Sequence, residues 1–223
     1  MSAMRSMPPG TRRALKRLLH WGRDLAGEVG LIGSSDPEAA AFGAFGEGAA
    51  LLWPQGVIYN QGSIRIGAKT MVGPNTALTV GIAPGQEILN DPVISIGERC
   101  IIGRGSHVVG HWSITIGDDI QTGPYVYITD QNHVYADVDR PIGIQTPVEA
   151  SVSIGSGSWL GANVVILPGT ELGEHTTVAA GAVVSGTFPP RVVLAGVPAR
   201  IVKRWVEGEG WVGPSTGTGD ALA

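Results

Sequence analysis

The sequence predicts a mainly β protein in which short parallel strands wind into a triangular solenoid. Three observations support this fold class. Aliphatic residues recur every six positions from Ile66 onward, glycine returns at fixed places in groups of three hexads, and glycine contributes 34 of 223 residues while aromatic residues contribute 6%. A six-residue period fits neither a helix, a heptad nor a simple strand alternation. Each hexad therefore predicts one short strand and one corner.

The repeated position is aliphatic in every hexad but one. The exception is Thr122, and the series comprises Ile66, Val72, Leu78, Ile96, Ile102, Val108, Ile116, Thr122, Ile128, Ile154, Leu160, Ile166, Leu172, Val178 and Val184. Such a repeat buries a continuous core only when its units stack on one another. We expect at least five coils.

The residue after the repeated position gives a longer period of 18 residues. It is glycine in the first hexad of each coil, glycine or alanine in the second, and never glycine in the third. Glycine suits a corner that needs either unusual dihedral angles or a close approach of two backbones. The first-hexad glycines are Gly67, Gly97, Gly117, Gly155 and Gly173.

The regular spacing fails at three places, and each failure follows the third hexad of a coil. The inserted loops are residues 79–95, 109–115 and 129–153. Because consecutive coils stack about 4.8 Å apart, these loops emerge along one edge of the prism. Insertions on one face of a solenoid commonly form its binding side.

The ends of the chain do not follow the repeat. Residues 1–56 predict a helical and irregular segment, with an amphipathic helix over residues 12–26. We expect this helix to pack on the first coil, and contact with a membrane surface is the alternative. The β-helix domain is predicted over 57–188, a C-terminal cap over 189–206 and a mobile tail over 207–223.

Composition limits the class of protein. The net charge of −4 gives little electrostatic support for nucleic-acid binding. The single cysteine, Cys100, indicates a reducing compartment, and no apolar run has the length of a membrane span. No secretory signal is evident. We therefore expect a soluble, cytoplasmic protein.

Three motifs carry a resemblance to a known family: "DQNHVYADVDRPI", "VSIGSGSWLGANVVILPGTELGEHTTVAAGAVV" and "PPRVVLAGVPARIVKR". With them, the stretch from Ile96 to Trp205 resembles the hexapeptide-repeat acyltransferases of left-handed parallel β-helix fold. The closest pattern is that of galactoside, maltose and polysaccharide O-acetyltransferases. The resemblance implies a left-handed coil, acetyl-CoA or another acyl-CoA as co-substrate, and a homotrimer with active sites between subunits.

The resemblance also implies the catalytic groups. His133 would be the general base, since a neutral imidazole titrates near working pH and can accept the proton of an acceptor hydroxyl. The amide of Ala162, just after Gly161, would stabilise the oxyanion of the attacked thioester. Trp159 would lie beside the acyl group, although packing on a prism face explains it equally well.

The coenzyme would bind near the C-terminal end by the same resemblance. The amide of Ala180 would contact the pantetheine arm, and Arg200 and Lys203 would lie near the nucleotide phosphates, where charge-assisted contacts are favourable. Family members often carry Thr-Lys where this chain has Ser185 and Gly186. Ser185 is retained as a candidate, and Arg191 could supply the missing phosphate contact.

The acceptor site is less defined by the sequence. We predict contributions from His111, Asp130 and Tyr135; His111 could instead assist His133 or only complete its loop. The group that orients the His133 imidazole is open between Asp130, Asp137, Asp139 and a backbone carbonyl.

Other functions remain as alternatives to an O-acyltransferase acting by direct attack. A γ-class carbonic-anhydrase-like enzyme would hold zinc across a subunit interface through His107, His111 and His133, but their spacing does not follow that family, and we expect no metal. An amino-sugar N-acyltransferase and a non-catalytic scaffold are the others; a scaffold would not bind coenzyme A.

Overall fold

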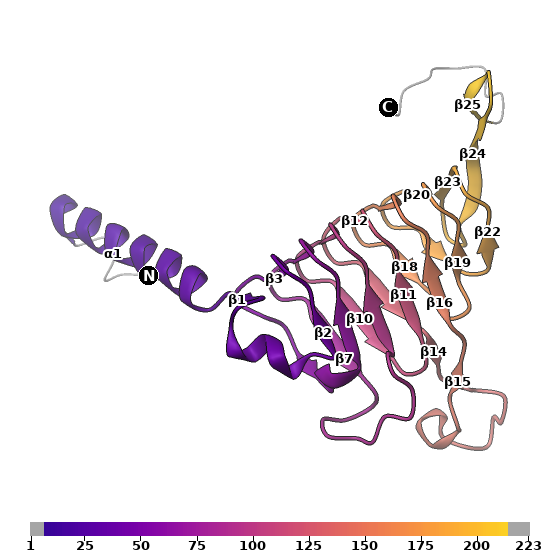
Figure 1. Ribbon diagram of the computed structural model, residues 1–223, viewed down its shortest axis with the longest axis horizontal. Helices are drawn as coiled ribbons and strands as arrows, with labels where there is room; N and C mark the ends of the chain where they lie inside the picture. The colour runs from indigo at the N-terminus through magenta and orange to yellow at the C-terminus, as the bar shows by residue number, and fades with distance from the viewer. Residues whose placement is uncertain (1–6, 214–223) are drawn as a thin grey trace.

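A triangular prism of stacked β-strands forms most of the computed structural model, which describes residues 7–213 (Figure 1). The chain visits three sheets in the order B, A and C, and then begins the next coil. Strands of successive coils pair in parallel with the aliphatic positions in register, for example Ile64↔Ile94 and Ile66↔Ile96. The predicted solenoid is confirmed.

The three sheets form the three faces of the prism. Sheet B contains β2 (Ala44–Phe45), β5 (Ile64–Ile66), β8 (Ile94–Ile96), β11 (Ile114–Ile116), β16 (Val152–Ile154), β19 (Glu171–Leu172) and β22 (Thr187–Phe188). Sheet A contains β1 (Ile32–Gly33), β3 (Ala50–Leu51), β6 (Met71–Val72), β9 (Ile101–Ile102), β12 (Gln121–Thr122), β17 (Trp159–Leu160), β20 (Thr177–Val178), β23 (Val192–Ala195), β24 (Arg200–Val206) and β25 (Gly210–Val212). Sheet C contains β4 (Ile58–Tyr59), β7 (Ala77–Val80), β10 (His107–Gly110), β13 (Tyr127–Thr129), β18 (Val165–Ile166) and β21 (Val183–Val184).

The repeated aliphatic side chains fill the prism. Each of the fourteen aliphatic members of the series is at most 4% exposed, so the hydrophobic effect favours closing every coil onto its neighbours. The exception, Thr122, is also buried, and its Oγ1 accepts a hydrogen bond from the backbone N–H of Gly103 (2.8 Å). In the next coil, the equivalent Gly123 N–H donates to the carbonyl oxygen of Leu160. A hydroxyl thus takes the place of a carbonyl as acceptor at this one position.

The first-hexad glycines permit close backbone approach rather than unusual dihedral angles. A Cβ atom on Gly155 would lie 2.6 Å from the carbonyl carbon of Gly173 in the next coil. The left-handed backbone conformation occurs two residues after these glycines, for example at Lys69 (φ 60°) and Arg99 (φ 55°). The backbone of the next coil therefore lies too close to these glycines to leave room for a side chain.

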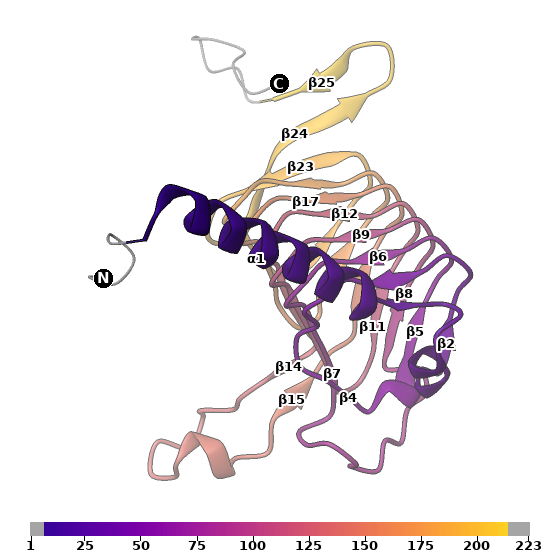
Figure 2. The same cartoon turned by 90° about the vertical axis from the view of Figure 1, so that its left-hand side faces the viewer.

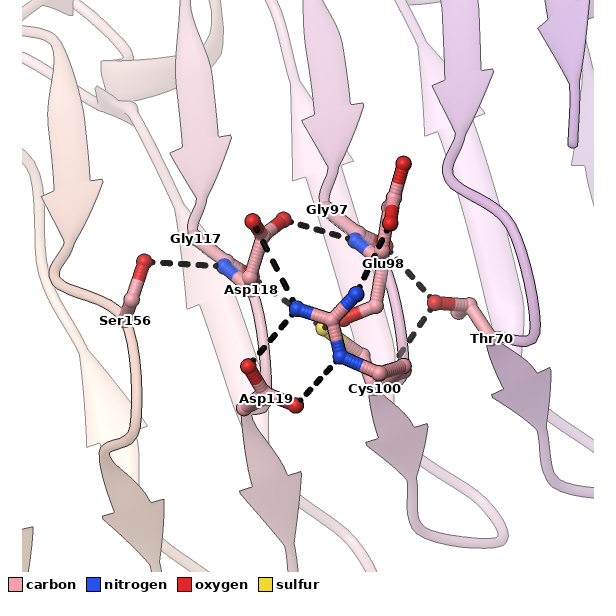
Figure 3. Close-up of polar contacts among 9 residues, drawn as sticks. Thr70, Gly97, Glu98, Cys100, Gly117, Asp118, Asp119 and Ser156 are labelled. Carbon is pink, nitrogen blue, oxygen red and sulfur yellow. Dashed lines mark hydrogen bonds and ion pairs between the residues drawn. The ribbon is translucent and has the colours of Figure 1, made fainter.

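Side chains link successive coils at the corner between sheets B and A (Figure 3). A carboxylate oxygen of Asp118 accepts from the backbone N–H of Glu98 (2.8 Å), and Oγ of Ser156 accepts from that of Asp118 (3.0 Å). The Arg99 guanidinium binds both carboxylate oxygens of Asp119, at 2.7 and 2.8 Å. These contacts join three coils outside the hydrophobic core.

Cys100 lies inside the same corner and has no disulfide partner. Its thiol donates to the carbonyl oxygen of Gly117 (3.1 Å), and burial raises its pKa. A thiol that is buried and protonated is a poor nucleophile, so Cys100 acts here as a small packing residue.

The solenoid starts earlier and ends differently from the prediction. A first coil formed by β2, β3 and β4 lies largely within the segment that we expected to be irregular, because an extra residue between Leu51 and Ile58 hides its hexad spacing. Two 3₁₀ turns, η1 (Pro37–Ala41) and η2 (Gln61–Ser63), flank it.

The C-terminal cap is an antiparallel extension of sheet A. β23 pairs with β24, and β24 pairs with β25, where the rings of Trp205 and Trp211 meet edge to face at 5.7 Å. The expectation of a mobile tail from residue 207 is therefore wrong for residues 207–213. Residues 214–223 lie outside the described part of the chain.

The helix α1 (Pro9–Val29) does not pack on the first coil, contrary to our expectation. None of its residues is buried, and it projects from the N-terminal end of the prism (Figures 1 and 2). It is attached through Gly30, whose carbonyl oxygen accepts from Nε2 of Gln55 (2.6 Å). Across residues 7–213, no helix combines the length and the apolar character needed to traverse a bilayer.

Candidate active site

All three insertions leave the prism at the corner between sheets C and B. They comprise residues 81–93, 111–113 and 130–151, and we call them together the insertion edge. The first is held by Asn60, whose Nδ2 donates to the carbonyl oxygens of Val80 (2.6 Å) and Ala83 (2.9 Å). Nδ2 of Asn90 donates to the carbonyl oxygen of Trp112 (3.2 Å), which links the first insertion to the second.

Asp130 connects the second insertion to the third. Its side chain is fully buried; one carboxylate oxygen accepts from the backbone N–H of His111 (2.8 Å), and the other accepts from those of Trp112 (2.8 Å) and Ser113 (2.7 Å). Its carbonyl oxygen accepts from the N–H of Ala150 (2.8 Å). Three backbone donors compensate the buried negative charge. Asp130 therefore shapes the insertion edge and, contrary to our prediction, has no exposed oxygen for an acceptor.

The third insertion is a folded structure and carries His133. β14 (Gln131–Asn132) and β15 (Val148–Glu149) form an antiparallel base, and η3 (Ile142–Ile144) lies near the tip. The buried Gln145 side chain donates to the carbonyl oxygens of Asp137 (2.9 Å) and Arg140 (3.0 Å). The loop conformation is thus fixed by its own polar contacts.

His133 follows β14 directly and is exposed. Its backbone N–H donates to Oδ1 of Asn132 (3.0 Å), and no hydrogen bond within residues 7–213 involves its imidazole. Of the residues expected to orient it, Asp130 is occupied by the second insertion, and Asp137 accepts from the N–H of Asp139 (3.1 Å). The imidazole is therefore free to meet a substrate or a neighbouring chain.

The same insertion carries several exposed apolar side chains. Tyr135 is 73% exposed, Val138 90% and Ile144 63%. His111, at the base of this edge, is half-buried and contributes its backbone to the Asp130 contacts. Tyr135 and His111 thus both lie on the insertion edge, on different loops, and their contact with an acceptor stays a prediction.

Sheet A carries the residues expected to contact the acyl donor. Trp159 on β17 points outward and is 51% exposed, with Gln121 and Thr177 as its neighbours on adjacent strands. The sheet ends at the corner between A and C, where Gly161 is followed by Ala162, and Ala180 occupies the equivalent place one coil later.

The amides of Ala162 and Ala180 have no acceptor within residues 7–213. The reason is their position at the corner, since the N–H groups on either side, such as those of Gly161 and Asn163, donate to the next and the preceding coil. Pro74 and Pro124 occupy the same place in other coils, so the coil does not need an N–H there. Two unpaired donors therefore lie one coil apart, about 4.8 Å, along one edge.

The predicted coenzyme-binding residues divide between different edges. Arg200 is opposite Ala195 in the β23–β24 pair. It therefore lies near the same edge of sheet A, at the corner between sheets A and C, as Ala162 and Ala180. Lys203 is opposite Val193 and lines a shallow pocket of about 220 Å³ between β24 and β25.

Arg191 and Ser185 lie away from that edge. Arg191 precedes β23 at the corner between B and A, where its N–H donates to the carbonyl oxygen of Glu174 (2.9 Å). Ser185 follows β21 at the far end of sheet C and is exposed. Arg191 is therefore not positioned in this chain to replace the basic residue that Ser185-Gly186 lacks.

The insertion that carries His133 is separated from the donor residues within one chain. In both views the β14–β15 insertion lies on the opposite side of the prism from β12 of sheet A (Figures 1 and 2). Within residues 7–213 of one chain, no three His, Cys, Asp or Glu side chains come together in a group that could hold a metal ion.

Sequence reasoning missed two features of this region. One is the structural role of Asp130, which depends on three amides that only the folded loop brings together. The other is the unpaired state of the Ala162 and Ala180 amides. The prolines at the equivalent positions 74 and 124 were an available signal, because a residue that lacks an N–H marks a place where the coil does not use one.

Family models match the repeat region of this chain. The model described as bacterial transferase hexapeptide (six repeats) matches residues 151–186, and the model described as hexapeptide repeat of succinyl-transferase matches residues 93–129. Both lie within the stacked coils.

Named relatives extend the similarity to most of the prism. WbbJ of Escherichia coli (strain K12), described as a candidate lipopolysaccharide biosynthesis O-acetyl transferase, is 33% identical over 155 residues, covering 66% of this chain and 75% of WbbJ. The galactoside O-acetyltransferase of the same organism is 32% identical over 115 residues, covering 49% of this chain and 56% of that enzyme.

A solved structure shares the fold at low sequence identity. AntD, an N-acyltransferase from Bacillus cereus in complex with dTDP and 3-hydroxybutyryl-CoA, superposes with a TM-score of 0.65 and 18% identity, covering 78% of this chain and 89% of AntD. The repeat, the two family models and the extent of the match to WbbJ agree with one another. This chain belongs to the hexapeptide-repeat acetyltransferases, and its fold is their left-handed parallel β-helix.

Proposed function

We propose that this protein transfers an acetyl group from acetyl-CoA to a hydroxyl group of a saccharide, with His133 as general base. The observation that carries the proposal is the pair of unpaired amides, Ala162 and Ala180, beside the exposed Trp159. The two O-acetyltransferase relatives named for lipopolysaccharide and galactoside support a saccharide hydroxyl as acceptor.

The chemical step needs no covalent enzyme intermediate. The acceptor oxygen attacks the thioester carbonyl carbon while the His133 imidazole takes the hydroxyl proton. The carbonyl oxygen becomes negatively charged and accepts a hydrogen bond from the Ala162 N–H. The C–S bond then breaks, and the imidazolium returns the proton to the coenzyme A thiolate.

The coenzyme would lie along the edge that bears Ala162 and Ala180. The Ala180 amide would donate to the pantetheine arm, and Arg200 on the same edge would approach the phosphates. Trp159 would cover the acyl group. The half-buried Lys203 lies farther along β24 and would meet the nucleotide end.

A homotrimer would join the two halves of the site. His133 lies across the prism from Ala162 within one chain, so the base of one subunit would face the Trp159 and Ala162 of its neighbour. The exposed apolar side chains of the third insertion support such packing, since burying them in a subunit interface would be favourable. We place this trimer in the cytoplasm, where a free thiol such as Cys100 remains reduced.

The proposal is tested by removing each group without disturbing the coil. Ala162→Pro deletes one N–H at a place where Pro74 and Pro124 are already accommodated. We expect kcat to fall by about 10² to 10³ with an unchanged melting temperature. Ala180→Pro should instead raise KM for acetyl-CoA about threefold to tenfold and leave kcat unchanged. An unaltered kcat in Ala162→Pro would remove this amide from the mechanism.

The base is tested with a matched pair of exposed histidines. His133→Asn should lower kcat by about 10² to 10⁴, whereas His175→Asn, at the corner between sheets B and A, should retain wild-type kcat. Acetyl transfer is measured by coenzyme A release with hydroxyl- and amino-sugar acceptors in parallel. Equal turnover in the two variants would eliminate His133, and preference for amino sugars would make this chain an N-acyltransferase.

Mixing the two inactive variants tests the subunit arrangement. If each site combines His133 of one chain with Ala162 of another, trimers reassembled from His133→Asn and Ala162→Pro chains regain part of the activity. If both residues act within one chain, the mixture stays as inactive as its components.

A further inference from the structure

The helix α1 has no partner in the prism, although one of its faces is strongly apolar. Leu19 is 68% exposed and Val29 76%. A Cβ atom added at Gly22 or Gly27 would meet nothing within 4 Å. Among residues 7–213, the helix is joined to the body at its C-terminal end, near Gly30 and Trp53. Its apolar face is therefore available for another surface.

The helix divides cleanly into two faces. At 3.6 residues per turn, its large apolar side chains fall on one side, and all of them are more than 40% exposed: Leu15, Leu18, Leu19, Trp21, Leu25 and Val29. The opposite side carries the cations Arg12, Arg13, Lys16, Arg17 and Arg23. Leucine and tryptophan opposite lysine and arginine are typical of helices that lie in a membrane interface.

The charge of the helix is opposite to that of the chain. The whole chain has a net charge of −4. In α1, five cations face only two acids, Asp24 and Glu28, and no acid lies between Arg12 and Arg23. A second copy of the helix would leave most of these cations without a counter-ion, because two acids per helix cannot neutralise five cations. An anionic lipid surface would neutralise them.

We propose that α1 binds flat on an anionic lipid bilayer, with its leucines and Trp21 at the acyl boundary and its cations among the lipid phosphates. The helix would hold the prism at the membrane surface without crossing the bilayer. This inference is independent of the acyl-transfer proposal, since it concerns binding and not turnover.

Vesicle co-sedimentation of the full chain tests the proposal. Wild-type protein should sediment with vesicles of phosphatidylcholine containing 30% phosphatidylglycerol in roughly 0.05 M salt, and much less with phosphatidylcholine alone. Raising the salt to about 0.5 M should weaken binding by screening. Equal binding to both vesicle types at all salt concentrations, or no binding, would overturn the proposal.

Matched variants distinguish vesicle binding through α1 from nonspecific binding through other exposed apolar residues. Leu18→Gln with Leu19→Gln should abolish sedimentation. Ile82→Gln with Leu89→Gln changes two apolar residues of the first insertion that are even more exposed (71% and 90%), and it should leave sedimentation unchanged. Loss of binding in the second variant alone would assign the membrane contact to the insertion edge.

The charge variants predict opposite shifts. Arg13→Gln with Arg17→Gln should weaken the partition coefficient by about tenfold or more, because each cation near an anionic surface strengthens binding about fivefold. Asp24→Asn with Glu28→Gln should strengthen it. A lipid-dependent blue shift of fluorescence should disappear in Trp21→Phe. If Leu18→Gln with Leu19→Gln instead changes the sedimentation coefficient without vesicles and leaves vesicle binding intact, the helix pairs with a second copy and the proposal fails.

Discussion

The corner between sheets B and A and the corner between sheets C and B differ in how they tolerate inserted residues. At the corner between sheets B and A no residue is inserted, and side chains such as Asp118, Ser156 and Arg99 join coil to coil (Figure 3). At the corner between sheets C and B the three long insertions emerge, and one buried carboxylate, Asp130, joins the second to the third. The comparison shows that an 18-residue period leaves one corner free to vary while another fixes the stacking.

The largest effect is expected from a glycine at the rigid corner. Gly155→Ala places a Cβ atom 2.6 Å from the Gly173 carbonyl carbon, where only backbone is present and nothing can rotate away. We expect the free energy of unfolding to fall by about 3 kcal/mol, as measured by urea denaturation.

The control for this prediction is a glycine on the insertion edge. Gly143→Ala adds the same methyl group with nothing within 4 Å, and the change should stay within about 0.5 kcal/mol. Equal stability losses in the two variants would show that the corners do not differ in their tolerance.

An intermediate effect is expected from the carboxylate of the variable corner. Asp130→Asn places an amide group among three backbone donors, so at least one contact becomes repulsive or is lost. We expect a loss of about 2 kcal/mol and faster amide hydrogen exchange at residues 111–113. Asp139→Asn makes the same chemical change at an exposed site of the same insertion and should alter neither measurement. Unchanged exchange in Asp130→Asn would assign the loop contacts to other groups.

The smallest effect concerns pH at the rigid corner. Hydrogen bonds from Arg99 lower the pKa of Asp119 below its ordinary value of 3.8. A carboxyl group with a lowered folded pKa contributes stability above its unfolded pKa and loses it as pH falls through the folded pKa. The melting temperature of wild type should therefore exceed that of Arg99→Gln above about pH 4, and the difference should shrink at lower pH.

Exposure keeps this difference small, since the Arg99 and Asp119 side chains are about half exposed. Arg23→Gln removes an exposed ion pair with Asp24 on α1, which lies outside the prism, and this control should leave the melting temperature of the prism unchanged. A pH-independent gap between wild type and Arg99→Gln would mean that Arg99 stabilises the corner by packing alone.

The fold could be predicted because its determinants are local and periodic. The aliphatic residue of each hexad specifies the core, and the glycines at fixed positions of the coil permit the stacking. The same pattern recurs in successive coils. The first coil was not predicted, because a single extra residue between Leu51 and Ile58 breaks the hexad spacing. The position of α1 was not predicted correctly. Amphipathicity indicates that one face of a helix needs a partner, but it does not identify that partner.

The candidate site was predictable only as a set of residues. The motif around His133 and the phrase containing Trp159 and Ala162 can be recognised in the sequence. Their placement on opposite sides of the prism follows from the order of the three sheets, which a hexad count does not convert into distances. The burial of Asp130 depends on loop contacts that have no periodic signature.

The single variable corner has a thermodynamic consequence. Lengthening a connection from the three residues of 111–113 to the 22 residues of 130–151 raises the closure entropy cost by only about 2 kcal/mol. A few hydrogen bonds to one charged side chain are enough to offset that amount. Descendants of this sequence could thus exchange a whole inserted loop for another while the remaining coils fold as before.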